Sequence, residues 1–427
     1  MLFEIHMLKN YPATNLNRDD TGAPKTCTFG GVQRSRISSQ CLKRSWRESP
    51  VLREEIDKNW LGIRTRKLPV LVCDKLKEEF ASTFEEKKLE EYLKAVKLIL
   101  AGIGKSTKEK AGDKDDDPTE KQNESGENET TKQNESGEIN TTKQIVFYSQ
   151  QDIDTVTNYF KDQIKDGKLF KDDKPTTLKA KELKEKANEI QKKLKSSAKN
   201  RPITVDIALF GRMVTSDAFA DVDASMQVAH AFSTNKVIME TDFFTAMDDM
   251  IDGKEENGSA MMGDTDYNSA CYYIYASIDV DKLKDNLKNA EDREKIVDVL
   301  IPALLKAMSW SNPGGKQNSF AGNVLPSAIL IECKDYPVPV SYANAFVKPV
   351  QSTYDTDLVK ASVQRLVEHV QKIDEEYNLP IEKRYWFCAG LDEKVPMADR
   401  KEKSVVENCQ SFSEMLNNLR QFIAQKK

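Results

Sequence analysis

The sequence predicts an α+β fold in which a sheet-forming region is interrupted by a helical insertion. Both ends of the chain carry short runs of apolar and β-branched residues, which are typical of strands. Between them, residues 51–200 show apolar side chains at helical spacing and many Lys, Glu, Ala and Leu residues. Strand patterns on both sides of a helical block indicate one α+β domain that holds the helical region as an insertion.

Several segments of the flanks are predicted strands, and others are helices that pack on the sheet. The strands are Leu2–Leu8, Thr204–Leu209, Cys271–Val280, Ala328–Cys333 and Tyr385–Cys388. The helices are Ile296–Met308 and Asp357–Ile373, with further helical patterns at Lys75–Leu100 and Leu178–Leu194 in the insertion. We expect residues 1–50 and 201–427 to form the sheet domain and residues 51–200 to form the insertion.

A tandem repeat lies inside the insertion. Residues 121–131 read KQNESGENETT and residues 132–142 read KQNESGEINTT. This tract has almost no apolar surface to offset the entropy of an ordered chain. We therefore expect a disordered tract over residues 105–143.

Length and composition are those of a folded, water-soluble protein. The chain has 427 residues, of which 39% are hydrophobic, and a formal net charge of -5. It has no apolar run long enough to span a bilayer, and its first residues lack the basic and apolar regions of a signal peptide. We expect a cytoplasmic protein with no membrane partner. The seven cysteines show no metal-binding spacing, so they are predicted to be reduced thiols, and no cofactor or metal is predicted.

The strongest functional signal is a cationic segment on this acidic protein. Residues 15–47 contain many more basic than acidic side chains, the only carboxylates being Asp19 and Asp20. The basic residues are Arg18, Lys25, Arg34, Arg36, Lys43, Arg44 and Arg47. A local cationic stripe of this kind indicates a bound polyanion.

The end of this stripe is predicted to be a helix. Ser38 or Ser39 is a suitable N-cap, and no Gly or Pro follows before Pro50. Leu42 and Trp46 are four residues apart and should face the core. The polar face then carries Gln40, Lys43, Arg44 and Arg47, and the main-chain amides at the helix start are available to a phosphate.

Two further segments carry candidate binding residues. Residues 202–213 are predicted to be a strand that ends in Gly211, Arg212 and Met213, with a cation and a flexible apolar side chain at the rim of the sheet. Residues 237–263 mix Phe and Met with Asp, a composition shared by a core helix and by a projecting hairpin that packs on another subunit.

Most sequence motifs that would indicate catalysis are absent or incomplete. Ser311–Gln317 resembles a phosphate loop, but Trp310 and Gln317 replace the required Gly and Ser/Thr, so it is not a nucleotide-triphosphate site. The sequence has no nucleophile elbow and no metalloprotease motif. The adjacent carboxylates of Asp19 and Asp20 could bind a metal, although turn capping or salt bridging is the commoner role of such a pair.

Several blocks, taken in order, resemble one protein family. The segment from Leu16 to Arg47, with Gly30-Gly31, Ser38-Ser39-Gln40 and Leu42-Lys43-Arg44, closely resembles the N-terminus of the CasC family, the backbone subunit of the type I-E CRISPR Cascade complex. The resemblance continues through Val205–Met213, Val222–Ala224, Ala229–Ala231, Asp242–Ala246 and Pro313–Gln317. The insertion resembles that of the family only in its helical character.

This resemblance implies a fold like a right hand. The palm would be related to the RNA-recognition-motif (ferredoxin-like) sheet, the inserted helices would be fingers, and residues 233–265 would be a thumb hairpin. Family members polymerise along a CRISPR RNA and present its spacer for pairing with target DNA. The implied partners are therefore CRISPR RNA, further copies of the chain, other Cascade subunits and the target DNA strand.

The resemblance also assigns roles to single residues. Those implied to hold the RNA backbone are Arg18, Lys25, Ser38, Gln40, Lys43, Arg44 and Arg47, with Lys316 as a weaker candidate. Gly211, Arg212 and Met213 would lie at the palm rim. Met213, Phe244 and Thr245 would wedge the strand so that one base per subunit is displaced. An apolar wedge unstacks a base step at a cost of about a few kcal/mol, which extra contact surface offsets.

We therefore expect a non-catalytic, guide-RNA-binding filament subunit of an antiviral surveillance complex. The rival interpretation is a backbone subunit of the type III kind, in which Asp19 or Asp20 cleaves target RNA with a metal. A third interpretation is an oligomeric structural protein that binds no nucleic acid.

Overall fold

The computed structural model describes residues 1–102, 141–142, 144–170, 180–214, 218–246, 261–390 and 406–426. Most of the predicted disordered tract, and the middle of residues 237–263, lie outside these ranges. The chain divides into two compact units, which are considered separately. Unit 1 comprises Met1–Asp57, Ser225–Asp285 and Glu294–Lys427, and unit 2 comprises Lys58–Ala224 and Asn286–Arg293.

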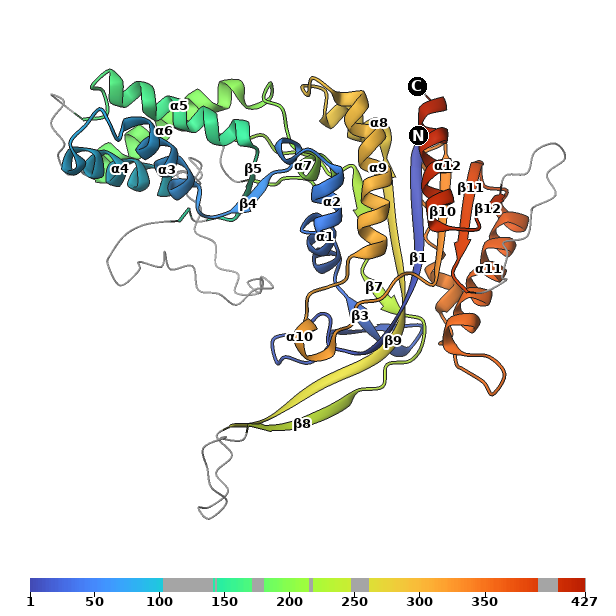
Figure 1. The fold of residues 1–427 in the computed structure, drawn as a ribbon. Helices are drawn as coiled ribbons and strands as arrows, with labels where there is room; N and C mark the ends of the chain where they lie inside the picture. The colour runs from blue at the N-terminus through green and yellow to red at the C-terminus, as the bar shows by residue number, and fades with distance from the viewer. Residues whose placement is uncertain are drawn as a thin grey trace, which may run out of the picture. The chain divides into compact units, whose positions relative to one another are not determined.

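Unit 1 is built on a ten-stranded sheet with the order β12-β11-β10-β1-β9-β7-β3-β2 (Figure 1). β6 and β8 also pair with β9, and the β11–β12 pair is parallel while the other pairs are antiparallel. The strands are β1 (Leu2–Thr14), β2 (Thr26–Phe29), β3 (Val32–Ile37), β6 (Met226–Val228), β7 (Ala231–Ser233), β8 (Glu240–Ala246), β9 (Met261–Asp279), β10 (Ala328–Lys334), β11 (Ile381–Cys388) and β12 (Val406–Asn408).

Unit 1 also contains helices. They are α1 (Ser39–Arg47), α2 (Pro50–Glu55), α8 (Val280–Asn286), α9 (Arg293–Trp310), α10 (Gln317–Phe320), η3 (Tyr342–Phe346), α11 (Leu358–Tyr377) and α12 (Phe412–Gln425). The mixed α+β class is thus as predicted, and the structure adds that the sheet is large and mostly antiparallel. The strands predicted at residues 2–8, 271–280, 328–333 and 385–388, and both flank helices, are confirmed, with most elements longer than expected.

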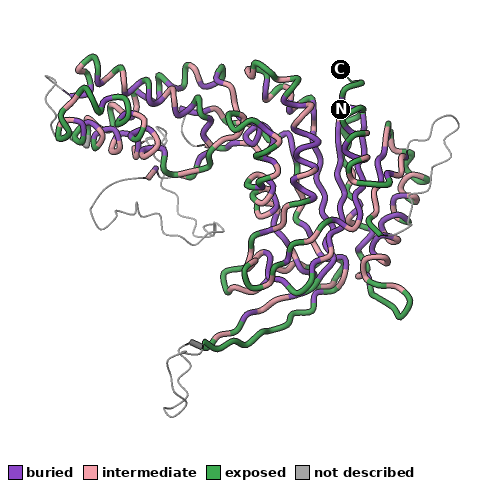
Figure 2. Tube along the Cα trace, viewed as in Figure 1, coloured by how far each residue is buried: buried purple, intermediate pink, exposed green. Residues whose placement is uncertain are grey.

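β1 lies in the middle of the sheet, between β9 and β10. Ile5 is opposite Ala276 of β9 and Ile331 of β10. Residues 2–9 are all buried, as Figure 2 shows for the central strands, because packed elements cover both faces of the strand. On one face Leu8 joins the apolar core formed with η3 and α11, and on the other Phe3 packs edge-on against Phe422 of α12.

Unit 2 is mainly helical. Its elements are η1 (Lys58–Trp60), β4 (Ile63–Thr65), α3 (Leu68–Phe80), α4 (Glu86–Ala101), β5 (Val146–Tyr148), α5 (Gln150–Lys165), α6 (Ala180–Ala198) and α7 (Val205–Phe210). α3 to α6 bury their apolar faces in one core, and β4 pairs with β5. Among the described residues, no helix is long and apolar enough to cross a membrane.

The predicted strand at residues 204–209 is wrong. The structure has the short helix α7 there, and it ends at Gly211, whose φ of 80° is in the glycine-favoured region. A side chain on Gly211 would also bring its Cβ to 2.9 Å from the carbonyl oxygen of Val222. A short apolar run that is buried all round has no periodicity that separates a strand from a helix, so the sequence pattern was ambiguous.

Candidate nucleic-acid interface

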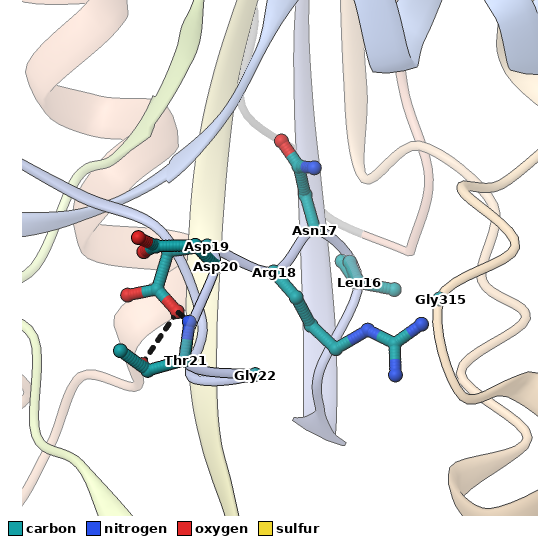
Figure 3. Close-up of a pocket in the computed structure, with 8 residues that line it drawn as sticks. All are labelled: Leu16, Asn17, Arg18, Asp19, Asp20, Thr21, Gly22 and Gly315. Atoms are coloured by element: carbon teal, nitrogen blue, oxygen red, sulfur yellow. Dashed lines mark hydrogen bonds between the residues drawn. The ribbon is translucent and has the colours of Figure 1, made fainter. Parts of the chain in front are cut away.

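The loop after β1 is held in shape by its own polar side chains. Asn15 Nδ2 donates to the carbonyls of Gly22, at 2.9 Å, and Asp266, at 2.8 Å. Asp19 Oδ1 accepts from the amides of Thr21 and Ala23, both at 3.0 Å, and from the Thr21 hydroxyl (Figure 3). The hydrogen bond from the Thr21 hydroxyl is the largest cause that lowers the pKa of Asp19. Asp19 is therefore a turn-capping carboxylate, the commoner role expected of this pair.

A shallow pocket of about 500 Å³ opens beside this loop. It is lined by residues 16–22 and by Gly315. In Figure 3 the Arg18 side chain extends away from the Asp19 carboxylate, toward the chain that carries Gly315. A Cβ at Gly315 would lie 2.3 Å from the carbonyl oxygen of Leu16, so only glycine allows the two segments to approach this closely.

The chain that carries Gly315 is anchored to the sheet. Lys9 Nζ, in β1, donates to the carbonyl of Ser311 at 2.8 Å, and the Tyr11 hydroxyl donates to Asn312 Oδ1 at 2.7 Å. Burial lowers the pKa of Lys9 to about 7. Beyond Gly315, Lys316 Nζ donates to the Thr265 hydroxyl of β9 at 2.8 Å. Lys316 is thus held next to the pocket-lining glycine, at the β9 strand of the hairpin.

Helix α1 begins and faces inward as predicted. Ser38 is its N-cap and accepts a hydrogen bond from the amide of Cys41 at 3.3 Å. Leu42 and Trp46 are buried, each about 2% exposed. Gln40 and Arg44 are exposed on the remaining surface, and Lys43 and Arg47 are partly exposed. Burial lowers the pKa of Lys43, and Arg47 pairs with the neighbouring Glu48.

The start of α1 differs from the expectation that its amides are available to a phosphate. The Ser38 amide donates to Asn17 Oδ1 at 2.8 Å, and the Ser39 amide donates to His230 Nδ1 at 3.3 Å. Ser38 itself is buried and its hydroxyl caps the helix. Much of the donor capacity of this turn is therefore used within the protein, and the exposed side chains carry the binding potential.

Asn17 joins the loop to the helix. Its side chain caps Ser38, and its carbonyl accepts the amide of Lys25 at 2.8 Å. Burial raises the pKa of the Cys41 thiol, and the charges of Arg44 and Lys25 partly oppose this increase. Both cations therefore lie near Cys41. Unit 1 thus brings Lys25 close to the cationic helix, with Arg18 one residue from Asn17.

Arg34 is not part of an exposed stripe. It is fully buried, and its guanidinium donates to four main-chain carbonyls, those of Ser233, Thr234, Phe346 and Val347, at 2.7–3.1 Å. Arginine satisfies several carbonyls at once because its donors form a planar fork. A charge count cannot distinguish this structural arginine from a binding one.

Within residues 237–263, β8 pairs with the first part of β9, and these two described strand segments project from the sheet as a hairpin (Figure 1). All seven residues of β8 are exposed, so a core helix is excluded here. Phe244 is 40% exposed and lies opposite Gly263, where its ring occupies the space that a Cβ would fill. Thr245 is exposed and lies opposite Met262, which is also largely exposed.

The predicted rim residues Gly211, Arg212 and Met213 belong to unit 2. Met213 is 92% exposed, as a wedge residue would need to be. Arg212 is 5% exposed, which contradicts the predicted cation at a sheet rim, because Nη1 donates to the buried Asp152 carboxylate at 2.9 Å. The same carboxylate pairs with Arg201 at 2.9 Å.

Sequence reasoning missed Asn15, Asn17 and His230. Asn15 holds the loop in shape, Asn17 accepts the amide of Ser38, the N-cap of α1, and His230 accepts the amide of Ser39. Asn in a turn-rich segment is a weak signal for such contacts. His230 lies in the block Ala229–Ala231 of the family resemblance, but it is far from α1 in sequence, so no local pattern indicated its contact with the helix.

Comparison with known proteins identifies the family. A family model described as CT1975-like protein (Cas_CT1975) matches residues 3–417. The chain belongs to this family of CT1975-like proteins. No curated protein matches the sequence.

Two solved structures share the fold. A chain titled "CRISPR RNA-guided surveillance complex, pre-nicking" is 23% identical, with a TM-score of 0.72 over 99% of this chain and 100% of that one. A chain titled "CRISPR RNA-guided surveillance complex" is 19% identical, with a TM-score of 0.64 and the same coverage. At these identities the likeness is one of fold, and it extends over the whole length of both chains.

Proposed function

We propose that this CT1975-like protein is the CRISPR RNA-binding backbone subunit of a Cascade-type antiviral surveillance complex. Copies of the chain would polymerise along the guide RNA beside other Cascade subunits and present the spacer for pairing with target DNA. Two findings favour this role over a structural protein without nucleic acid: the family membership and the full-length likeness to chains of RNA-guided surveillance complexes.

The observation that carries the proposal is the exposed cationic surface around α1. Burial of Leu42 and Trp46 turns Gln40, Lys43 and Arg44 toward solvent, and Asn17 ties this helix to Lys25 and to the loop of Arg18. Lys and Arg that contact phosphates fix the position of a strand without reading its sequence. A scaffold that must accept any spacer needs this kind of contact.

The finer architecture is part of the proposal. The sheet of unit 1 would be the palm, related to the RNA-recognition-motif fold, the helices of unit 2 the fingers, and the β8–β9 hairpin the thumb. Phe244 and Thr245 on the hairpin, and Met213 in unit 2, are the proposed wedge residues, supported by their exposure. Arg47 and Lys316 are weaker candidates, because Arg47 pairs with Glu48 and Lys316 donates to Thr265.

We propose no catalytic role. The Asp19 carboxylate already accepts hydrogen bonds that shape its own loop, and each of these would compete with a bound metal. An Asp20→Ala variant tests the rival interpretation, since metal-dependent cleavage of target RNA that disappears in this variant would favour the type III kind of subunit.

The test is co-expression with a CRISPR array, followed by purification and extraction of nucleic acid. Wild type should retain discrete RNA, and a Lys43→Glu, Arg44→Glu double variant should lose it. A Lys372→Glu, Arg420→Glu variant makes the same charge change at exposed positions of α11 and α12, and it should retain the RNA. Equal, negligible RNA in all three proteins would overturn the proposal.

RNA affinity should also fall with salt. For single-stranded RNA the logarithm of affinity falls against the logarithm of salt concentration with a slope of about -0.7 for each phosphate contact. The Lys43→Glu, Arg44→Glu variant should therefore show a shallower slope as well as weaker binding, whereas the control variant should keep the wild-type slope.

A further inference from the structure

We infer that His230 is a positioning residue of the RNA-binding surface, because its imidazole holds the first turn of α1. This inference rests on the proposed function of α1. His230 lies between β6 and β7, and it directly precedes Ala231, which pairs with Ile37 at the end of β3. The residue therefore stands where the chain passes from β3 into α1, although it is distant in sequence.

The hydrogen bonds of His230 define its role. Nδ1 accepts from the Ser39 amide at 3.3 Å and faces Arg36 Nη1 at 3.2 Å. Both partners can only donate, so Nδ1 must be the unprotonated nitrogen, and the proton of the neutral ring is on Nε2. One acceptor atom thereby connects β3, through Arg36, with the first turn of α1.

Side chains accept hydrogen bonds from several main-chain amides of this turn. Asn17 binds the Ser38 amide, the Ser38 hydroxyl binds the Cys41 amide, and His230 binds the Ser39 amide. Free amides at a helix start are satisfied by such contacts or by water. Among these three acceptor atoms, His230 Nδ1 is the one for which the structure also shows a contact with a cation of the neighbouring strand, Arg36.

The residues that pack α1 into the core are different from the residue that positions its first turn. The core of α1 is supplied by Leu42 and Trp46, whereas His230 is exposed. Loss of the imidazole should leave the helix packed but should loosen the turn that leads to Gln40, Lys43 and Arg44. The expected result is weaker RNA binding with little change in the melting temperature.

The decisive variants are His230→Ala and His230→Asn. Alanine removes the acceptor, whereas the side-chain oxygen of asparagine can replace Nδ1 as an acceptor. Gln227→Ala, at an exposed position of β6, is the matched control. The probe is a fluorescently labelled single-stranded RNA, titrated with RNA-free protein, and peptide-level hydrogen exchange reports on residues 38–42.

His230→Ala should weaken RNA binding about two- to tenfold, the range expected for the loss of one positioned hydrogen bond. It should also speed exchange in residues 38–42, while His230→Asn and Gln227→Ala should behave as wild type in both measurements. The inference is overturned if His230→Ala binds as tightly as wild type, or if His230→Asn, folded by its melting temperature, binds as weakly as His230→Ala.

A parallel Lys43→Glu variant separates the role of His230 from the proposed RNA binding by α1. Weak binding by Lys43→Glu together with normal binding by His230→Ala would remove the role of His230 and leave the proposed function intact. Failure of wild type itself to bind the RNA would remove the proposed function, and with it this inference.

Discussion

The buried guanidinium of Arg34 donates a 2.7 Å hydrogen bond to the main-chain carbonyl of Thr234. Thr234 follows β7 and leads into the exposed hairpin, so this bond ties β3 to the base of the hairpin. Further bonds from the same side chain reach Phe346 and Val347. A residue from the cationic segment of residues 15–47 therefore organises the framework of unit 1 instead of its surface.

Arg34→Lys should destabilise the protein by about 2–5 kcal/mol, because lysine keeps the buried charge but cannot reach all of the carbonyls that the guanidinium satisfies. Urea denaturation of the full chain, followed by circular dichroism, measures the change. Arg44→Lys, the same exchange at an exposed position, should stay within about 0.5 kcal/mol of wild type. Equal stability of the two variants would show that the Arg34 contacts contribute little.

Asp152→Asn should destabilise unit 2 by about 3–5 kcal/mol, because it leaves the buried side chains of Arg201 and Arg212 without their shared carboxylate. Hydrogen exchange of the α5 segment in the full chain checks this. Asp154→Asn on the same helix removes a half-exposed ion pair with Lys75 and should cost less than about 1 kcal/mol. Similar exchange in both variants would contradict the prediction.

Lys9 should make stability depend on pH. Burial lowers its pKa from 10.5 to about 7, so between these values the unfolded chain binds more protons than the folded chain, and stability rises with pH. Relative to Lys9→Met, the wild type should therefore gain on the order of a few kcal/mol between about pH 7 and 10, with no further change below this range. Urea denaturation at several pH values measures the difference.

The matched control is Lys372→Met, at an exposed position of α11. Its stability difference from wild type should be flat over the same pH range. A Lys9→Met difference that is equally flat would mean that the Lys9 ammonium stays protonated in the folded protein, with enough compensation from Ser311 and Asn312.

Local patterns predicted α1 well. The Ser38 cap and the spacing of Leu42 and Trp46 are properties of neighbouring residues, so they could be read directly from the sequence. The same holds for the apolar runs of β1, β9, β10 and β11, which lie within the strands that the structure shows. α7 was misread because it is short and buried, which removes the amphipathic pattern that separates a helix from a strand.

Long-range contacts could not be predicted. Arg34 and Arg212 look like surface cations in sequence, and only the fold shows that carbonyls or Asp152 surround them. His230 and Ser39 are likewise brought together by the β3–β7 pairing. Charge in the sequence therefore indicated a candidate surface, but the structure was needed to separate the exposed cations of this segment from the buried, structural ones.

We propose that RNA of any sequence lies along the cationic surface of α1 and its loop. Photocrosslinking of purified protein to two RNAs of unrelated sequence, with mass spectrometry of the linked peptides, tests it most directly. We predict that both RNAs crosslink to peptides within residues 15–47 and that the Lys43→Glu, Arg44→Glu variant loses these links. Crosslinks confined to other segments, or links to one RNA sequence alone, would contradict the claim.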